Sequence, residues 1–287
     1  MPKAKDWSSF LSQESKARQV SPLKGLANYL KIPNLISLGG GLPNPSYFPF
    51  GYVDVRVPSE GRYLEQQILD EGTTLRIVKS PLPTLIQSPT DHDTTLNGGD
   101  GVSSKGYPTD LSVTLQYAQG FGDVELRKWA KEHIATVHNP PYEDWDVTLT
   151  IGNTMSFEVC LRTLFERGDS ILMEEYAYTS GIFACRPQGI NIVGIAMDGE
   201  GMKPDKLDER LLEWDELKQG RKPRVAYLVP YSLFPCQSNG YRTGQNPSGA
   251  TMFLERRKAL YSIFQKHDIL VIEDEPYCTQ PLLTCII

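Results

Sequence analysis

Short apolar runs recur along the chain from about residue 109, and stretches with a different pattern separate them. The runs have the length of buried strands, and branched or aromatic residues are common in them. They occupy residues 146–152, 170–175, 191–198, 225–230 and 269–274. We therefore expect five strands in this part of the chain.

Between the runs, apolar side chains return every three or four residues, which is the period of a helix with one buried face. One such face is formed by Phe157, Leu161, Leu164 and Phe165. Helices are also expected over residues 126–134, after Tyr178, over 203–218 and over 252–268. In the last of these, Thr251 is the expected N-terminal cap, and Phe253, Leu260 and Phe264 are expected to share a face.

Strands that alternate with helices predict an α/β fold with a mainly parallel sheet and helices on both faces. Ligands of such sheets bind at the carboxyl ends of the strands. Residues 51–108 interrupt this order because they are rich in Ser, Thr, Gly, Asp and Pro, and we expect an irregular connection there. Residues 1–50 form a separate N-terminal segment.

Composition and charge narrow the class of protein. The 287 residues carry a formal net charge of −6, which provides no basic surface for nucleic acid. We expect neither a membrane span nor a secretory signal, because no apolar run is long enough to span a membrane and the N-terminus has no apolar h-region. The five cysteines include no CxxC pair and the four histidines no HExxH pattern, so we expect reduced thiols, no metal and a cytoplasmic location.

Two candidate ligand-binding positions follow the first two predicted strands. Asn153 and Thr154 open a helix after 146–152, and free N–H groups at a helix start attract phosphate. The alternative is an ordinary cap, and the turn has neither the GxGxxG nor the P-loop pattern. Tyr178 follows 170–175 and could stack on a planar ligand, or be an ordinary aromatic residue of the core or its rim.

Two more candidates follow the later strands. Asn246 lies in a turn with two glycines and a proline, which can present its side chain rigidly. Asp274 ends the last strand, and a carboxylate there needs a cation or a donor, such as a protonated heterocyclic nitrogen. A plain turn and a solvated acidic loop are the alternatives. Together the four positions indicate a site for pyridoxal phosphate.

Longer motifs resemble those of one family. Residues 243–277, TGQNPSGATMFLERRKALYSIFQKHDILVIEDEPY, resemble the signature of class I/II aminotransferases, which are fold-type I pyridoxal-phosphate enzymes. SLGGGLPNPSYFPF at 37–50 and IGNTMSFEVCLRTLFERGDSILMEEYAY at 151–178 are similar to the branch of fungal aromatic and kynurenine/2-aminoadipate aminotransferases. The likeness covers most of residues 6–277 and is weakest over 56–105.

The resemblance implies a role for each candidate. Asn153 and Thr154 would bind the phosphate of pyridoxal 5′-phosphate, and Tyr178 would stack on its ring. Asn246 and Tyr277 would bind the 3′ oxygen, and Asp274 the ring nitrogen. Gly39 and Gly40 would line the substrate pocket, so that residues 1–50 contribute to it, and Tyr117 would reach the partner's phosphate across a homodimer.

The same resemblance implies the fold and the reaction. Residues 109–277 would form part of a three-layer cofactor-binding large domain whose sheet is incomplete at its C-terminal end, with most of the small domain missing. The reaction would exchange an amino group between an aromatic amino acid, 2-aminoadipate or kynurenine and a 2-oxo acid such as 2-oxoglutarate. Neither nucleic acid nor a membrane is an expected partner.

The chain departs from the family pattern in one decisive feature. The family uses a lysine that forms a Schiff base with the cofactor, beyond the strand that ends in EDEPY, and no lysine of residues 1–287 has that context. Lys258 and Lys266 are poor substitutes, because they lie on the helix before that strand. We therefore expect these 287 residues to be inactive as a transaminase.

Two segments look foreign to the family, residues 231–242 and the tail 278–287. One hypothesis is that both are retained introns or errors in the gene structure. A tolerated surface insertion and a genuine short form are the alternatives. A non-catalytic fragment that binds the cofactor weakly, or does nothing, also stays open. The transcription regulators built on this fold are disfavoured, because residues 1–50 do not resemble a basic helix-turn-helix domain.

Overall fold

The structure is a computed structural model that describes residues 2–19, 32, 41–59, 64–79, 110–230 and 244–275. The chain divides into two compact units. The first unit to be described contains residues 5–18 and 150–285 and holds the parallel sheet, and the second contains residues 1–4, 19–149 and 286–287. The tail 278–287 and the segment 231–242 lie outside the described residues.

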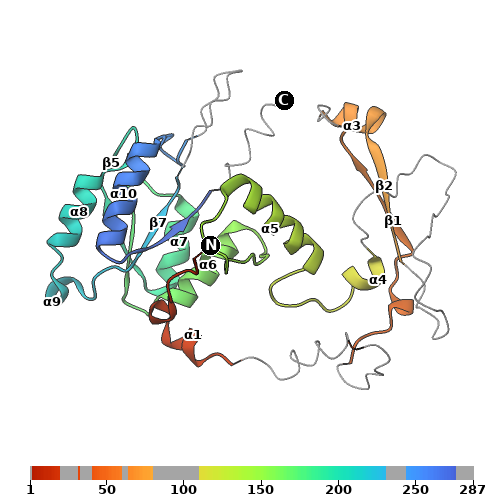
Figure 1. The fold of residues 1–287 in the computed structure, drawn as a ribbon, viewed down its shortest axis with the longest axis horizontal. Coiled ribbons are helices and arrows are strands. Elements are labelled where there is room, and N and C mark those ends of the chain that lie inside the picture. The colour runs from red at the N-terminus through yellow and green to blue at the C-terminus, as the bar shows by residue number, and fades with distance from the viewer. Residues whose placement is uncertain are drawn as a thin grey trace. The chain divides into compact units, whose positions relative to one another are not determined.

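Four parallel strands form the sheet of the first unit (Figure 1). They are β3 (Ser170–Glu174), β4 (Asn191–Ile195), β7 (Val225–Leu228) and β8 (Leu270–Glu273), in the order β4-β3-β7-β8. The predicted α/β class with a parallel sheet is confirmed, and four of the five predicted runs contain these strands. The carboxyl ends of all four strands therefore lie at one edge of the sheet.

Successive side chains of the strands point to opposite faces, and each face has its own apolar core. Ile171 and Met173 of β3 pack with Leu161 and Phe157 of helix α6 (Asn153–Leu164), on the face that also holds α7 (Thr179–Cys185). Leu172 packs on the other face with residues of α8 (Pro204–Leu212) and α10 (Leu254–Lys266). The expected helix layers on both faces are thus present.

Shorter elements complete the first unit. They are η1 (Ser8–Phe10), α1 (Gln13–Ala17), η4 (Arg186–Gln188), β5 (Met197–Asp198), β6 (Gly201–Met202) and α9 (Glu216–Gln219). β5 and β6 pair as a small antiparallel hairpin. Ser12 attaches the N-terminal segment to the C-terminal end of α6, since its N–H donates to Thr163 O at 2.8 Å and its hydroxyl to Arg162 O at 2.8 Å.

Four local predictions were wrong. Residues 146–152 form no strand, because no described strand pairs with them and an unpaired segment lacks the ladder of backbone hydrogen bonds. The single helix expected over 203–218 is two, α8 and α9. Thr251 does not cap α10, because the helix begins at Leu254 and its cap residue is Phe253. Phe253 is also exposed rather than on the buried face.

The second unit contains an antiparallel strand pair and three described α-helices. Its elements are η3 (Pro45–Tyr47), β1 (Tyr52–Val57), α3 (Glu65–Glu71), β2 (Thr73–Val78), α4 (Leu111–Thr114) and α5 (Val124–His138). β1 and β2 pair from Tyr52 with Val78 to Val57 with Thr73. Asp123 caps α5 by accepting from Leu126 N–H at 2.9 Å, and the predicted helix at 126–134 is confirmed within α5.

Part of the connection expected to be irregular is therefore regular. Residues 52–78 contain β1, α3 and β2, whereas 80–109 lie outside the described residues. The pair was missed because the high Ser, Thr, Gly, Asp and Pro content of residues 51–108 as a whole indicated a loop, although residues 53–57 (VDVRV) alternate apolar and polar side chains as a strand does. Among the residues that the structure describes, every helix is too short or too polar to span a lipid bilayer.

Candidate functional site

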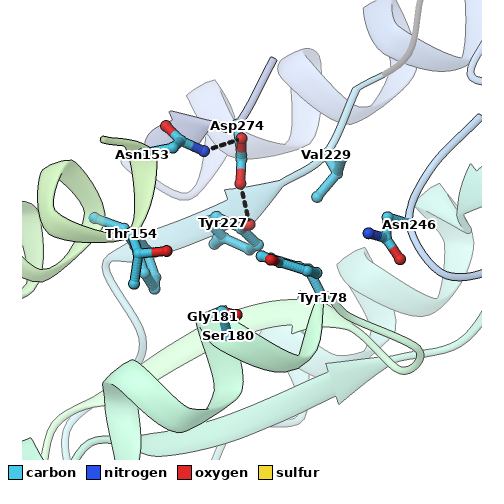
Figure 2. A pocket seen from close by; sticks show the side chains of 10 residues that line it. Asn153, Thr154, Tyr178, Ser180, Gly181, Tyr227, Val229, Asn246 and Asp274 are labelled. Carbon is cyan, nitrogen blue, oxygen red and sulfur yellow. Dashed lines mark hydrogen bonds between the residues drawn. The ribbon is translucent and has the colours of Figure 1, made fainter. Parts of the chain in front are cut away.

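A pocket of about 240 Å³ lies at the carboxyl edge of the parallel sheet (Figure 2). Residues from five separate parts of the first unit meet there: the start of α6, the start of α7, the end of β7, the end of β8, and the turn after residue 243. The lining residues are Asn153, Thr154, Phe157, Tyr178, Ser180, Gly181, Tyr227, Val229, Asn246 and Asp274. The edge is where the parallel topology predicts a ligand.

The half-buried carboxylate of Asp274 is held on both of its oxygens. Asn153 Nδ2 donates to Oδ1 at 2.5 Å, and the Tyr227 hydroxyl donates to Oδ2 at 2.6 Å (Figure 2). The backbone N–H of Asp274 donates to Leu228 O at 2.8 Å, which continues the ladder between β7 and β8. A carboxylate offers about four lone-pair sites, so both oxygens can accept a further donor from the pocket.

Tyr227 is a pocket residue that the sequence analysis missed. Its side chain is buried and its ring lies 4.6 Å from that of Phe157. Burial, with a smaller contribution from the hydrogen bond to Asp274, raises the pKa of its hydroxyl far above the ordinary value, so the group stays a donor. A usable signal existed, because a buried tyrosine within the apolar run 225–230 needs a partner for its hydroxyl.

The start of α6 presents backbone donors toward the pocket. Gly152 precedes the helix with φ of 79°, a left-handed conformation that favours glycine, and no side chain caps the first turn. The N–H groups of that turn are thus available to an anion, and the helix dipole favours negative charge there. Thr154, in the same turn, adds a hydroxyl at the pocket wall (Figure 2).

Tyr178 and Asn246 line the pocket together (Figure 2). Tyr178 is half-buried and is the cap residue of α7, so its position is fixed by the helix that follows. Asn246 lies in a turn closed by two backbone bonds, Gln245 N–H to Ala250 O at 2.8 Å and Gly249 N–H to Gln245 O at 2.6 Å. This closed turn holds the Asn246 side chain at the wall.

The structure thus brings together five of the predicted site residues: Asn153, Thr154, Tyr178, Asn246 and Asp274. Tyr117 belongs to the second unit, where its side chain is exposed. Gly39, Gly40 and Tyr277 lie outside the described residues. The carboxylate, the aromatic ring, the amide and the helix start form a donor and acceptor set that matches a cationic heterocycle bearing an oxygen and a phosphate.

The sequence is similar to those of several known aminotransferases. The chain is 40% identical over 276 residues to an aromatic amino acid aminotransferase of Schizosaccharomyces pombe, covering 95% of the chain and 51% of that protein. It is 32% identical over 273 residues to an L-tyrosine:2-oxoglutarate aminotransferase of Serpula lacrymans, covering 95% of the chain and 46% of that protein. No profile of a known protein family matches the chain.

A solved structure shows the same fold. The crystal structure of aminotransferase Aro8 from Candida albicans superposes with a TM-score of 0.76 at 38% identity, covering 96% of this chain and 51% of that one. Over nearly its whole length, the chain is thus similar to proteins named as aromatic amino acid aminotransferases, the class that its motifs resemble. The chain spans about half the length of these relatives.

Proposed function

We propose that the pocket binds pyridoxal 5′-phosphate and that the protein is part of a transaminase acting on aromatic amino acids with a 2-oxo acid such as 2-oxoglutarate. The observation that supports this best is the place of Asp274, at the end of β8 and in one pocket with Tyr178, Asn246 and the start of α6. The S. pombe and S. lacrymans relatives, named as aminotransferases of this specificity, support the reaction class.

In this proposal each side chain has one task. The N–H groups of the first turn of α6 and the Thr154 hydroxyl bind the phosphate. Tyr178 covers one face of the ring, and Asn246 donates to the oxygen at ring position 3. Asp274 accepts from the protonated ring nitrogen, while Asn153 and Tyr227 keep its carboxylate turned toward the pocket.

When bound, the cofactor supplies an electron-withdrawing heterocycle that draws charge away from the α-carbon of an amino acid. Asp274 contributes by keeping the ring nitrogen protonated, because a carboxylate within hydrogen-bonding reach favours the charged form of its partner. For a complete protein we propose a homodimer in which Tyr117 reaches the partner's phosphate, and a substrate pocket to which Gly39 and Gly40 contribute.

We further propose that a polypeptide of these 287 residues binds the cofactor but has no transaminase activity. No lysine is among the described residues that line the pocket. Lys258 and Lys266 lie on α10 and pair with Glu255 and Asp208, at 2.9 and 2.8 Å. A non-catalytic cofactor-binding chain is the second candidate function, favoured by the lack of a lysine among the described pocket residues, and it makes the same prediction for binding.

The test uses pyridoxamine 5′-phosphate, which has the ring, the oxygen and the phosphate but needs no lysine to bind. Fluorescence titration of the purified chain is expected to show saturable binding. Asp274→Asn keeps the shape of the side chain and removes its charge, so the affinity should fall about tenfold or more, the effect of losing one charged hydrogen bond.

The matched control is Asp268→Asn, just before the opposite end of the same strand, where the carboxylate pairs with Lys5. This variant should bind like the wild type. Equal affinities for the wild type and Asp274→Asn, or no binding by the wild type, would overturn the proposed site.

A further inference from the structure

Behind the asparagine turn lies a buried pair of polar side chains that the proposed roles do not use. Glu174, the last residue of β3, is 3% exposed, and Gln245, the residue before Asn246, is 1% exposed. Gln245 Nε2 donates to Glu174 Oε2 at 2.9 Å and to the backbone oxygen of Tyr176 at 2.6 Å. The pair therefore ties the turn to the segment that leads to Tyr178.

Each remaining polar atom of the pair also has a partner. Gln245 Oε1 accepts from Ser248 N–H at 3.0 Å and from the Ser248 hydroxyl at 2.5 Å, both within the turn. Glu174 Oε1 accepts from Met202 N–H at 3.1 Å. Residue 201 is a glycine with φ of 86°, and a Cβ there would lie 3.0 Å from Glu174 Oε1, so the hairpin backbone approaches the carboxylate closely.

Because Asn246 directly follows Gln245, the bonds of Gln245 fix the start of the turn that carries Asn246 into the pocket. Gln245 is buried away from the ligand, whereas Asn246 lines the pocket. Burying a carboxylate costs free energy unless its hydrogen bonds are satisfied, and here both oxygens accept from N–H donors. A simple apolar contact would hold the turn without this cost, but would fix its direction less strictly.

We propose that the Glu174–Gln245 pair is a positioning device that sets where Asn246 meets the oxygen at position 3 of the cofactor ring. This inference rests on the proposed function, because it assigns the pair to the same pocket. Glu174 and Gln245 do not touch the ligand themselves. They act through Asn246, so their loss should weaken the contact at position 3 and spare the contacts of the phosphate and the ring nitrogen.

Two ligands separate that effect from a general loss of structure: pyridoxamine 5′-phosphate and its analogue without the 3-hydroxyl group. Gln245→Leu and Glu174→Gln are each expected to lower the affinity for pyridoxamine 5′-phosphate about tenfold. The affinity for the 3-deoxy analogue should fall by less than about twofold. In Glu174→Gln, the side-chain amide has one oxygen that accepts and one NH₂ group that donates. Gln245 Nε2 and Met202 N–H are both donors, so one of them loses its partner. Titrations are run above the pKa of Glu174, which burial raises to about 7.

The matched control is Glu175→Gln, the same change at the next residue. Glu175 is exposed, and its Oε1 accepts from Met197 N–H at 3.0 Å in the same hairpin, whereas the side chain of Gln245 bonds to Glu174, Tyr176 and Ser248. The Glu175→Gln variant should bind both ligands with the affinities of the wild type. The swapped pair, Glu174→Gln with Gln245→Glu, restores an N–H donor facing a carboxylate and should recover part of the lost affinity.

A ligand-free measurement tests the pair independently of the proposed function. Hydrogen exchange of residues 244–251 should speed up about tenfold in Glu174→Gln and Gln245→Leu, and not in Glu175→Gln. If the wild type binds neither ligand, the proposed function fails and this inference with it. If the wild type binds both but the variants lose both ligands equally, or exchange is unchanged, the positioning role is overturned while the proposed function stands.

Discussion

Tyr227 of β7 and Asp274, which directly follows the neighbouring strand β8, are joined by a hydrogen bond of 2.6 Å from the phenol to the carboxylate. The strand register brings Leu228 opposite Glu273. Tyr227 precedes Leu228 and Asp274 follows Glu273, so the two side chains can meet at the sheet edge. The phenol is buried while the carboxylate faces the pocket. The hydroxyl of Tyr227 therefore holds the Asp274 carboxylate in place and is part of the candidate site.

Removing that hydroxyl should cost stability. Tyr227→Phe keeps the ring contact with Phe157 and deletes the donor to a charged acceptor, so the free energy of unfolding should fall by about 1.5–3 kcal/mol. Urea denaturation followed by circular dichroism measures the change. Tyr176→Phe, at an exposed tyrosine, should stay within about 0.5 kcal/mol of the wild type. Equal losses in the two variants would contradict the role of the Tyr227 hydroxyl.

The turn that carries Asn246 depends on a close approach of two backbone segments. A Cβ on Gly244 would lie 2.1 Å from the backbone oxygen of Gly249, which cannot move away without opening the turn. Gly244→Ala should therefore destabilise the protein by about 1–3 kcal/mol and weaken the binding of pyridoxamine 5′-phosphate. Thermal denaturation and fluorescence titration measure the two effects.

Gly199→Ala is the matched control for this change. A Cβ there would have no atom within 4 Å, although Gly199 also contacts the segment after the turn through Thr251. The control should behave like the wild type in both measurements. A Gly244→Ala protein with wild-type stability and affinity would show that the turn is not closed as described.

The sequence predicted the sheet better than its surroundings. Strands β3, β7 and β8 are continuous apolar runs because both faces are covered, and such runs are visible without knowledge of partners. Residues 146–152 (DVTLTIG) alternate polar and apolar side chains, which also indicates a strand, but no described strand pairs with them. A single segment cannot show whether it has a partner. The β1–β2 pair was missed because the composition of residues 51–108 as a whole indicated a loop, although residues 53–57 alternate apolar and polar side chains.

The site was predicted in part for similar reasons. Three site residues could be predicted from their position in the sequence, because they follow strands or lie in a glycine turn: Asp274, Asn246 and Tyr178. Tyr227 and Glu174 lie inside apolar runs, where a polar residue is easily counted as part of the core. Only the contacts with Asp274 and Gln245 show what each does.

Core packing around α6 should hold the helix start in place. Leu161 is fully buried against the sheet, so Leu161→Ala should lower the free energy of unfolding by about 2–5 kcal/mol through lost apolar contact and a cavity. Leu217, on α9, is 99% exposed, and Leu217→Ala should change the free energy by less than about 0.5 kcal/mol. Urea denaturation of both variants makes the comparison. A small effect at Leu161 would contradict the packing of α6 on β3.

The buried carboxylate of Glu174 should make stability depend on pH in a defined window. Burial raises its pKa from 4.5 to about 7, against the opposing effect of its hydrogen bonds with Gln245 and Met202. Between these two values the folded protein keeps a proton that the unfolded chain has lost. The free energy of unfolding should therefore fall as pH rises from about 4.5 to about 7 and stay level above that.

The size of this effect is about 3 kcal/mol, at about 1.4 kcal/mol for each unit of pKa. Glu174→Gln has no titrating group at this position, so the wild type minus the variant isolates the contribution of Glu174 from that of all other acids. Urea denaturation across the window should show this difference decreasing with pH. If the two proteins instead have parallel pH profiles, Glu174 is not held in the buried, proton-retaining environment that its contacts define.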